Sequence, residues 1–471
     1  MKHEERTSSR YLSWAIKSLS FASQFPGAVK ISLITKTLFT AVSVLLVFQF
    51  FAFIGSYASD LLFSDQWDFY RPLILQKNFW ETFSWQHGPH RQGIGLVVTQ
   101  RLAEWTHFDA RADAFAVGLA LLLALGLALF LKYRLFGRIT LYDLALPFLF
   151  LSLFQFEALV LVPNLSHGAM PILLMILYVL SLLIQKPWLR YSLLLVLNFM
   201  LIYTGFGVFM GIITLVLFAV EAYQRHRDHL PMAYSLIAFT VAVVSGLSFF
   251  IDYRFFQTAA ICSSLEIKYI PQYPVFMSLM LANPVGWNLG WVGWLAYPLG
   301  GALLVLSGIV LFLCSRRLWK IGLYQDRAYL VIVILLGYSF LFCFNAAIGR
   351  SCLGLSAAQS SRYIPLLIPA FLALYFYLLR LHIKGRLPMV VLSIYVVLLS
   401  AGSLPLGIID KAIMPYYSAK ANWKACYVRY QNVRYCNEVT GFQPYPNADV
   451  LESELRYFKT QQLNIFMPQR K

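Results

Sequence analysis

Apolar runs of about 20 residues recur along most of the chain and dominate what it can fold into. A helix needs roughly 20 apolar residues to cross a bilayer, because its backbone polar groups must be satisfied internally. Only 13% of the 471 residues are charged, whereas soluble globular chains carry about 25%. The sequence therefore predicts an all-α polytopic membrane protein with about eleven transmembrane helices, at residues 37–59, 114–131, 141–162, 169–184, 191–203, 206–221, 232–251, 288–313, 328–348, 363–381 and 388–409.

The apolar stretch from 191 to 221 is interpreted as two short helices. Basic residues flank it on both sides, at 186–190 and at 225–227. A single span would place these flanks on opposite sides of the membrane, against the preference of basic loops for the cytoplasm. A break at Thr204 and Gly205 gives a hairpin whose two basic flanks share one side.

The Lys and Arg residues of the connecting segments predict the orientation. Of the 38 basic residues, 20 fall in segments that should all lie on one side: 1–36, 132–140, 185–190, 222–231, 314–327 and 380–387. These segments are expected to be cytoplasmic, with the amino terminus inside and the carboxyl terminus outside. The formal charge of +17 is then partly an orientation signal. A nucleic-acid-binding protein would need a basic soluble domain, which the sequence lacks.

The amino-terminal segment, residues 1–36, has two interpretations. It is either a basic amphipathic helix that lies on the inner leaflet, where anionic lipid attracts it, or a disordered tail. The apolar run that follows is too long and begins too late for a cleaved signal peptide. We expect it to remain as a membrane anchor.

The predicted topology divides the chain into the amino-terminal segment, a transmembrane domain at 37–409 and an extracytoplasmic tail at 410–471. Three segments face outward: the first outer loop at 60–113, the segment 252–287 and the tail. Of the 21 acidic residues, 15 lie outside or at the outer ends of helices. Because acids contribute little to topology, this asymmetry indicates a reaction or binding site on the outer face.

Asp65 and Asp68 lie in the first outer loop, just after the first span. Their spacing puts both carboxylates on one face of a helical turn, and Trp67 and Phe69 are expected to anchor the segment at the membrane interface. Two neighbouring carboxylates can hold a divalent cation, or one can act as a base while the other tunes it. A solvated helix cap is the alternative.

His87, His90 and Arg91 follow in the same loop around a Gly-Pro turn. The two histidines could bind a metal, but no third ligand adjoins them in the sequence. Contact with a phosphate or a sugar is an equal alternative, so substrate binding is the role we expect of the three residues.

Four further polar residues fall at outer membrane depth. Glu157 lies within an apolar run, where an ionisable group is a functional candidate because its desolvation is costly. His167 follows one loop later, and a structural histidine is its alternative interpretation. Arg350 and Arg362 lie on a small-residue loop, where Arg suits bidentate phosphate recognition or else anchors the helix ends at the membrane surface.

Cys426 and Cys436 lie in the tail, in the stretch CYVRYQNVRYC. Alternating apolar and polar residues around Gln431 and Asn432 suggest a small β-hairpin closed by a disulfide on the oxidising side of the membrane. Cys262 and Cys352 also face outward and are alternative partners.

Several of these features together resemble the GT-C superfamily of polyprenyl-phosphate-dependent membrane glycosyltransferases. They are the D-x-W-D stretch of Asp65 and Asp68, the H-x-x-H-R stretch ending at Arg91, the Gly-broken hairpin and the SRY stretch ending at Tyr363. The likeness is closest to a branch of uncharacterised bacterial members and covers most of the chain in topology. Those members often read HNEHR where this chain reads HGPHR, and the missing Glu removes one acid from the loop.

The resemblance implies a transfer reaction on the outer face of the bacterial cytoplasmic membrane. Asp65 is expected to take the proton of an acceptor hydroxyl that attacks the sugar carbon, while polyprenyl phosphate departs. Asp68 would assist or hold a divalent cation, and Glu157 is the reserve acid. Arg350 and Arg362 would stabilise the departing phosphate, with His87, His90, Arg91, His167 and Tyr363 as further substrate-binding residues.

The expected partners are a polyprenyl-phosphate-linked sugar donor, a glycan, lipid or protein acceptor, and membrane lipid. Two other functions remain open. An O-antigen polymerase or ligase shares many spans and outer arginines, but usually carries its large outer loop late in the chain. A transporter or flippase for lipid-linked sugars would need polar residues at mid-membrane and helices broken on a repeat axis.

Overall fold

The computed structural model describes residues 33–255, 262, 267–286, 293–382, 386–400, 402 and 407–467, and most of these residues lie in helices. The amino-terminal segment predicted at 1–36 lies almost entirely outside the described residues.

Six helical segments in the described part of the chain are long and apolar enough to cross a membrane. They are built on α2 (Leu33–Tyr57), α6 (Arg111–Phe136), α10 (Val208–Arg227), α13 (Ala296–Ile321), α14 (Arg327–Arg350) and α15 (Ile364–His382). Five shorter apolar segments accompany them: the broken segment around α7 (Ala145–Phe150), α8 (Ala169–Ser181), α9 (Pro187–Ile202), α11 (Ala233–Ser248) and α16 (Arg386–Ser400). These segments coincide with the eleven predicted apolar runs, so the structure supports an all-helical, multi-pass membrane architecture.

The run predicted at 141–162 is not one helix. It passes through a 3₁₀ turn (Leu141–Leu144), α7, a second 3₁₀ turn (Leu153–Gln155) and a π-helical turn (Glu157–Leu161). Broken backbone is tolerated at membrane depth only where protein covers it, and Leu159 is fully buried here. Single π-helical turns often occur at functional sites, and this one carries Glu157.

The segment 252–287 is not wholly an outer loop, which corrects the sequence-based prediction. Its residues Tyr273–Ala282 form a ten-residue apolar helix, α12, that packs against α13 and α14. Phe276 and Met280 are fully buried there. Ten apolar residues are too few for a span, so hydropathy alone leaves such a buried helix in a loop.

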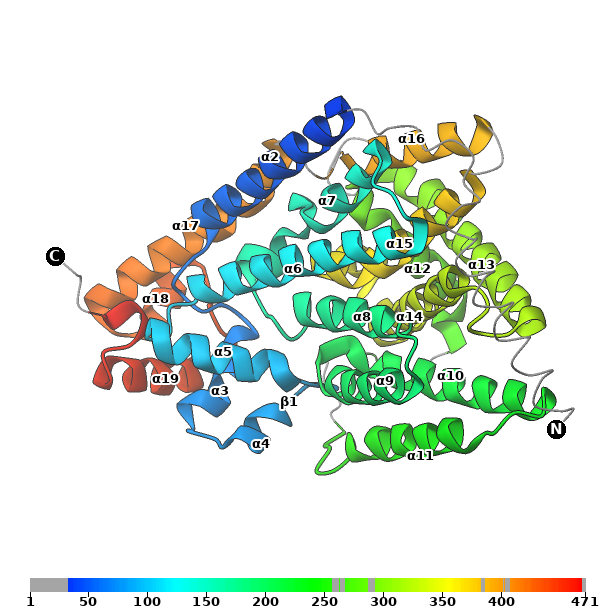
Figure 1. Cartoon of the computed structure of the whole chain (residues 1–471). Helices are drawn as coiled ribbons and strands as arrows, with labels where there is room; N and C mark the ends of the chain where they lie inside the picture. Colours follow the sequence, from blue (N-terminus) through cyan, green and yellow to red (C-terminus); the bar gives the residue numbers. More distant parts are fainter. Residues whose placement is uncertain are drawn as a thin grey trace, which may run out of the picture.

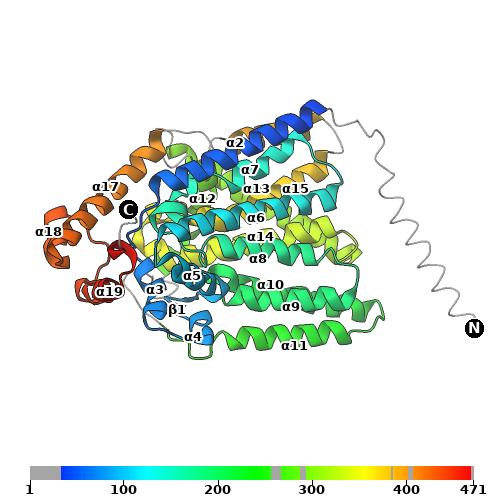
Figure 2. The ribbon, with the colours of Figure 1, turned by 60° about the vertical axis from the view of Figure 1, so that its left-hand side comes forward.

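Alternating helix directions place the connecting loops at two ends of the bundle (Figures 1 and 2). We call one the acidic end, which carries loops 58–110, 162–168, 203–207 and 351–363. We call the other the basic end, which carries loops 137–140, 182–186, 228–232 and 322–326.

The first loop at the acidic end is largely helical, as expected. It contains α3 (Gln66–Ile74), α4 (Phe79–Phe83) and α5 (Gly93–Thr106), with the two-residue strands β1 (Gln86–His87) and β2 (His90–Arg91) paired antiparallel between α4 and α5. Gly88 has φ +56° in the turn between the strands, a conformation that glycine adopts without strain.

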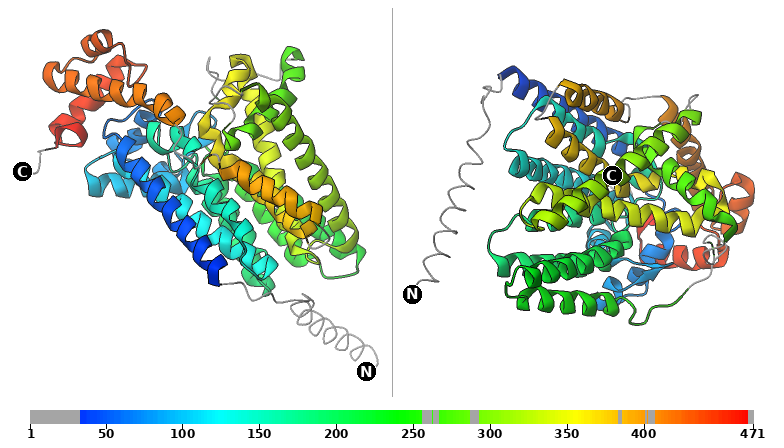
Figure 3. Two further views of the ribbon diagram at one scale, coloured as in Figure 1. Left: turned by 90° about the horizontal axis from the view of Figure 1, so that it is seen from above. Right: turned by 90° about the vertical axis from the view of Figure 1, so that its right-hand side faces the viewer.

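The tail forms a small helical lobe that packs on this loop. The last predicted span, 388–409, ends early: α16 stops at Ser400, and α17 (Gly407–Tyr430) is a separate helix, followed by α18 (Val433–Thr440) and α19 (Ala448–Thr460). Figure 3 shows these last helices standing beside the bundle rather than within it.

The interface between lobe and loop is a second hydrophobic core. Trp67 and Phe69, expected at the membrane interface, are instead buried in or beside this core, and the Trp67 ring centroid lies 5.8 Å from that of Phe458. The sequence did not separate these two locations, because an aromatic residue that suits the membrane interface also suits a protein core.

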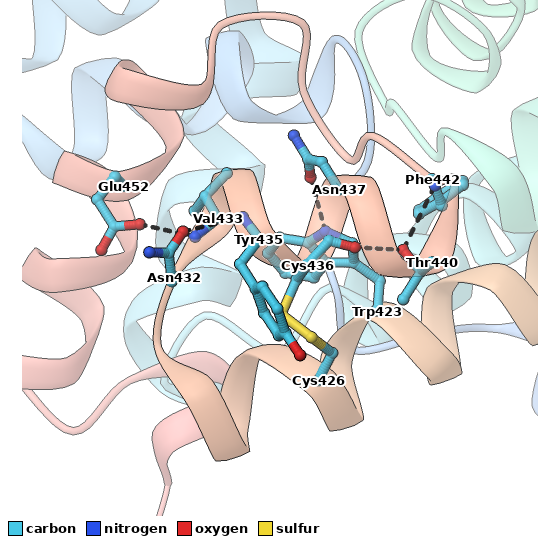
Figure 4. The surroundings of a disulfide bond; sticks show 10 residues. All are labelled: Trp423, Cys426, Asn432, Val433, Tyr435, Cys436, Asn437, Thr440, Phe442 and Glu452. Atoms are coloured by element: carbon cyan, nitrogen blue, oxygen red, sulfur yellow. Dashed lines mark hydrogen bonds between the residues drawn. A yellow bond between two sulfur atoms is a disulfide. The ribbon is translucent and has the colours of Figure 1, made fainter.

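The predicted β-hairpin at Gln431 and Asn432 is wrong. The two residues connect α17 to α18, and the Asn432 side chain accepts a hydrogen bond from the Tyr435 amide at 2.9 Å, which caps the second helix. Cys426 is nonetheless bonded to Cys436 across this helical turn (Figure 4). The bond joins two helices rather than two strands.

Candidate functional site

Asp65, Asp68 and His87 converge at the acidic end. Asp65 occupies the cap position of α3 and Asp68 its first turn, while the Gly88 turn carries His87 back over them. His87 Nε2 lies 4.0 Å from an oxygen of Asp65, and His87 Nδ1 lies 3.8 Å from an oxygen of Asp68. One ligand atom from each of the three residues fits within a span of 4.8 Å, so the group offers two carboxylates and an imidazole to a cation or to a hydroxyl.

The tail contributes directly to this group. The Tyr445 hydroxyl donates a hydrogen bond of 2.9 Å to Oδ1 of Asp68, and the Ser64 amide donates one of 2.7 Å to the Pro444 carbonyl. Nothing in the sequence around Tyr445 predicts that it contributes to this group. Tyr445 and Asp68 are separated by 377 positions in the sequence, and no local pattern predicts their contact.

A row of rings extends from His87 toward the interior. The Phe69 ring packs edge-on against His87 at 4.8 Å and against His167 at 5.3 Å, and His167 packs against His90 at 5.5 Å between ring centroids. The Gln92 side chain is hydrogen-bonded to Nε2 of His167 at 2.9 Å. The structure therefore brings together three histidines that the sequence places in two separate loops.

His90 and His167 are held neutral. Burial, together with the positive potential of His87 and Arg350, lowers the pKa of His90 to about 3. Burial and then His90, His87 and Arg362 lower the pKa of His167 well below its usual value. Nδ1 of His90 is buried without a hydrogen-bond partner among the described residues, so the hydrogen-bonding capacity of this imidazole nitrogen is unused in the structure.

The Gly-broken hairpin between α9 and α10 holds His167 in place. A Cβ atom on Gly205 would lie 2.3 Å from the Ser166 carbonyl oxygen, and Gly205 has φ +52°. Only glycine lets the two loops approach this closely. The break predicted from basic flanks thus becomes part of the wall of the site.

Glu157 accepts hydrogen bonds from the start of the SRY turn, the 3₁₀ turn Ser361–Tyr363. One of its oxygens accepts a hydrogen bond of 2.6 Å from the Ser360 hydroxyl, and the other accepts one of 3.3 Å from the Ser361 amide. Nε of Arg362 lies 3.6 Å from Glu157 and donates at 3.0 Å to the Ser360 hydroxyl. These contacts favour a positioning role for Glu157 over the role of reserve acid.

Arg350 and Tyr363 border the same turn. Arg350 is half-buried at the end of α14, and Tyr363 is buried against Phe342, with the two rings edge-on at 5.9 Å. Cys262 is bonded to Cys352, two residues after Arg350. This second disulfide ties the loop that carries Arg350 to the segment after α11.

Arg91 differs from the other expected substrate-binding residues. It is buried, and its guanidinium donates to the Phe249 carbonyl at 2.7 and 2.9 Å and also to the carbonyls of Ile251 and Ser84. These contacts join the first outer loop to the end of α11. The structure therefore favours a scaffolding role for Arg91.

Comparison with known proteins gives no further guide to the site. No protein-family model matches the chain, no curated protein matches it, and no solved structure matches it.

Proposed function

We propose that the chain is a GT-C-type glycosyltransferase of the bacterial cytoplasmic membrane. It transfers a sugar from a polyprenyl-phosphate donor to a surface glycan, lipid or protein. In this proposal all eleven apolar segments cross the membrane and the acidic end faces outward. The observation that carries the proposal is the convergence of Asp65, Asp68 and His87 on the same end of an apolar bundle as Arg362.

Asp65 is the proposed base. Its side chain is 43% exposed, whereas that of Asp68 is 28% exposed and is held by Tyr445. An accessible carboxylate can take the proton of an acceptor hydroxyl while the hydroxyl oxygen attacks the anomeric carbon. The bond from that carbon to the phosphate oxygen breaks, and its electron pair leaves with the polyprenyl phosphate.

Arg362 and Arg350 are the proposed cations for the leaving phosphate. Arg362 has a side chain that is 57% exposed and a guanidinium oriented by Ser360 and Glu157. Cations fixed where negative charge develops stabilise a transition state without a cost of reorganisation. Neutral His90 and His167 leave the positive charge of this region concentrated on the arginines.

Asp65, Asp68 and His87 could also hold a divalent cation. Carboxylate and imidazole ligands suit Mn²⁺ or Zn²⁺, and carboxylates suit Mg²⁺. Such an ion would add positive charge near the donor phosphate. In that case Asp65→Asn and Asp68→Asn should cause similar losses, and excess cation should partly restore both variants.

The test compares cell-envelope glycans and lipids, by mass spectrometry, from cells that carry the wild-type chain, no chain or the Asp65→Asn variant. Asparagine keeps the size of aspartate but cannot accept the proton, so the transferred sugar should fall by roughly 100-fold or more. The matched control is Glu104→Gln, which neutralises an exposed acid of the same outer loop that is paired with Arg101.

Wild-type product levels in Asp65→Asn cells at normal expression would contradict the catalytic assignment. A flippase is the outcome to distinguish, because moving a lipid requires no proton acceptor at Asp65. Loss of a flippase would change which side of the membrane carries the lipid-linked sugar. The total amount of sugar transferred in detergent-permeabilised membranes would not fall.

A further inference from the structure

An apolar groove lies at the basic end, away from the site described above. It has a volume of about 480 Å³ and is lined by Phe130 of α6, Leu177 and Leu180 of α8, and Leu193 and Leu197 of α9. Both α6 and α9 pack against α8, which has only 13 residues. The short middle helix leaves the space between its longer neighbours.

Three arginines gather where this groove meets the loop 182–186. Arg134 lines the groove itself and is exposed, with its guanidinium 5.7 Å from the centre of the Phe130 ring. Arg190 donates to the Ile184 carbonyl at 3.4 Å, and Arg327 donates to the Gln185 side chain at 3.1 Å. Ile184 and Gln185 also line the groove.

None of the three arginines forms an ion pair within the described part of the chain. The carboxylates of the described basic end are each paired with another cation: Asp143 with Lys132 at 2.7 Å, Glu221 with Arg225 at 3.1 Å, Asp228 with Arg227 at 3.0 Å and Asp326 with Arg380 at 2.9 Å. Nε of Arg190, moreover, is buried without a hydrogen-bond partner among the described residues. The cluster therefore combines uncompensated positive charge with an apolar cavity.

We propose that this groove is a binding site for an anionic phospholipid. One acyl chain fills the apolar space and the phosphate lies against Arg134, with Arg190 and Arg327 adding to the positive potential. Free phosphate would use the arginines but leave the leucine-lined walls empty. A neutral lipid would fill the walls but leave the charge unmatched. Basic pockets between helices on the cytoplasmic side are suited to anionic headgroups.

The proposal does not depend on glycosyl transfer, so either one can fail alone. Its test places the full-length protein in nanodiscs of equal parts phosphatidylglycerol and phosphatidylcholine and counts the retained lipids by native mass spectrometry. The wild-type protein should retain phosphatidylglycerol in preference. Arg134→Gln should reduce that preference about fivefold, the effect of one Arg near an anionic headgroup.

Matched controls separate the groove from general charge and hydrophobicity. Arg316→Gln removes an exposed cation of the basic end that does not line the groove, and it should retain the preference. Leu197→Trp fills the groove and should abolish the preference. Val196→Trp places the same indole ring on a neighbouring side chain that is 55% exposed and does not line the groove, and it should retain the preference.

Three results would overturn the proposal. One is equal retention of the two lipids by the wild-type protein. Another is an equal effect of Arg134→Gln and Arg316→Gln. The third is displacement of the retained lipid by millimolar inorganic phosphate, which would identify a site for a free anion.

Discussion

Asp65 and Asp68 are neighbours on one turn, but their surroundings differ. Both carboxylates lie near His87. Among the described residues, Asp68 also accepts a 2.9 Å hydrogen bond from Tyr445, whereas the Asp65 carboxylate accepts only a 3.4 Å hydrogen bond from the Ser64 hydroxyl. A carboxylate held by a tyrosine is well oriented but has one lone pair already in use. This difference assigns proton acceptance to Asp65 and orientation to Asp68 in the proposed reaction.

Tyr445→Phe tests this division of roles. The variant removes the hydroxyl donor and keeps the ring, so the tail should still fold on the loop. Hydrogen bonds to charged groups contribute roughly 1.5–3 kcal/mol, so we expect sugar transfer to fall by about tenfold or more. Transfer rates of purified protein in proteoliposomes provide the measurement.

Tyr435→Phe is the control, since Tyr435 belongs to the same lobe and is 41% exposed. Near-ultraviolet circular dichroism should be the same for both variants. Normal transfer by Tyr445→Phe would mean that the tail contact is structural only.

The residues of the site differ in how far the sequence could predict them. Asp65, Asp68 and His87 lie within 23 positions of one another, and spacing and residue type single out each of them as a candidate. Their convergence into one group was not predicted, because it depends on the turn at Gly88. The Tyr445 contact and the binding of the SRY turn by Glu157 join distant segments. Such contacts depend on the packing of the whole bundle, which periodicity does not encode.

At the scale of elements, α19 docks on α3 through a buried acid. Glu454 has a side chain that is 7% exposed, and one of its oxygens lies 3.9 Å from Nε of Arg71. Burial raises the pKa of Glu454 to about 7; Arg71 opposes the shift and the Asp68 carboxylate adds to it. The Glu454 carboxyl therefore holds its proton more tightly when the lobe is docked than when it is undocked, where its pKa is near the ordinary value of 4.5.

This shift predicts that docking weakens as the pH rises. Below about pH 4.5, Glu454 is protonated in both the docked and the undocked lobe, and docking has its full strength. Between 4.5 and 7 the undocked lobe loses its proton first, so the docking free energy declines by roughly 3 kcal/mol at most and then stays constant. Hydrogen exchange of the α19 amides, corrected for intrinsic rates, should be faster at pH 7.5 than at pH 5.5.

Glu454→Gln should abolish this dependence, because glutamine does not titrate. Glu438→Gln, an exposed acid of the same lobe, should retain it. If the wild-type lobe and Glu454→Gln respond equally to pH, Glu454 does not control docking.

Some helices can be predicted from the sequence pattern alone, and others cannot. Long apolar runs identify spans because the bilayer imposes one strong requirement on them. The helix α12 and the turn between α17 and α18 were mispredicted because both are short. Ten apolar residues or an alternating stretch of eleven fit more than one structure, and only their neighbours decide between them.

At the scale of the whole molecule, two segments far apart in sequence must lie on the same side of the membrane. The lobe of α17–α19 shares a hydrophobic core with the first outer loop, and the basic loops gather at the opposite end. Any topology must therefore keep the loop and the tail together. The orientation proposed from the Lys and Arg residues then predicts that both are extracytoplasmic.

Two reporters test this arrangement. A phosphatase fused after Lys471 should be active, because it would fold outside, and a cytoplasmic reporter at the same position should be silent. Cysteine substitutions provide the independent measurement, since the unbonded cysteines of the described chain, Cys314 and Cys343, are buried. Glu104→Cys should react with a membrane-impermeant thiol reagent in intact cells, whereas Arg138→Cys, at the exposed basic end, should react only after permeabilisation.

The tail reporter and the labelling of Glu104→Cys together separate an error in the fold from an error in the orientation. If Glu104→Cys and the tail reporter indicate opposite sides, the shared core of lobe and loop is wrong. If they agree but both are cytoplasmic, the fold stands and the orientation is reversed. A reversed chain would expose Asp65, Asp68 and His87 to the cytoplasm, and an outward-facing glycosyltransferase would no longer be tenable.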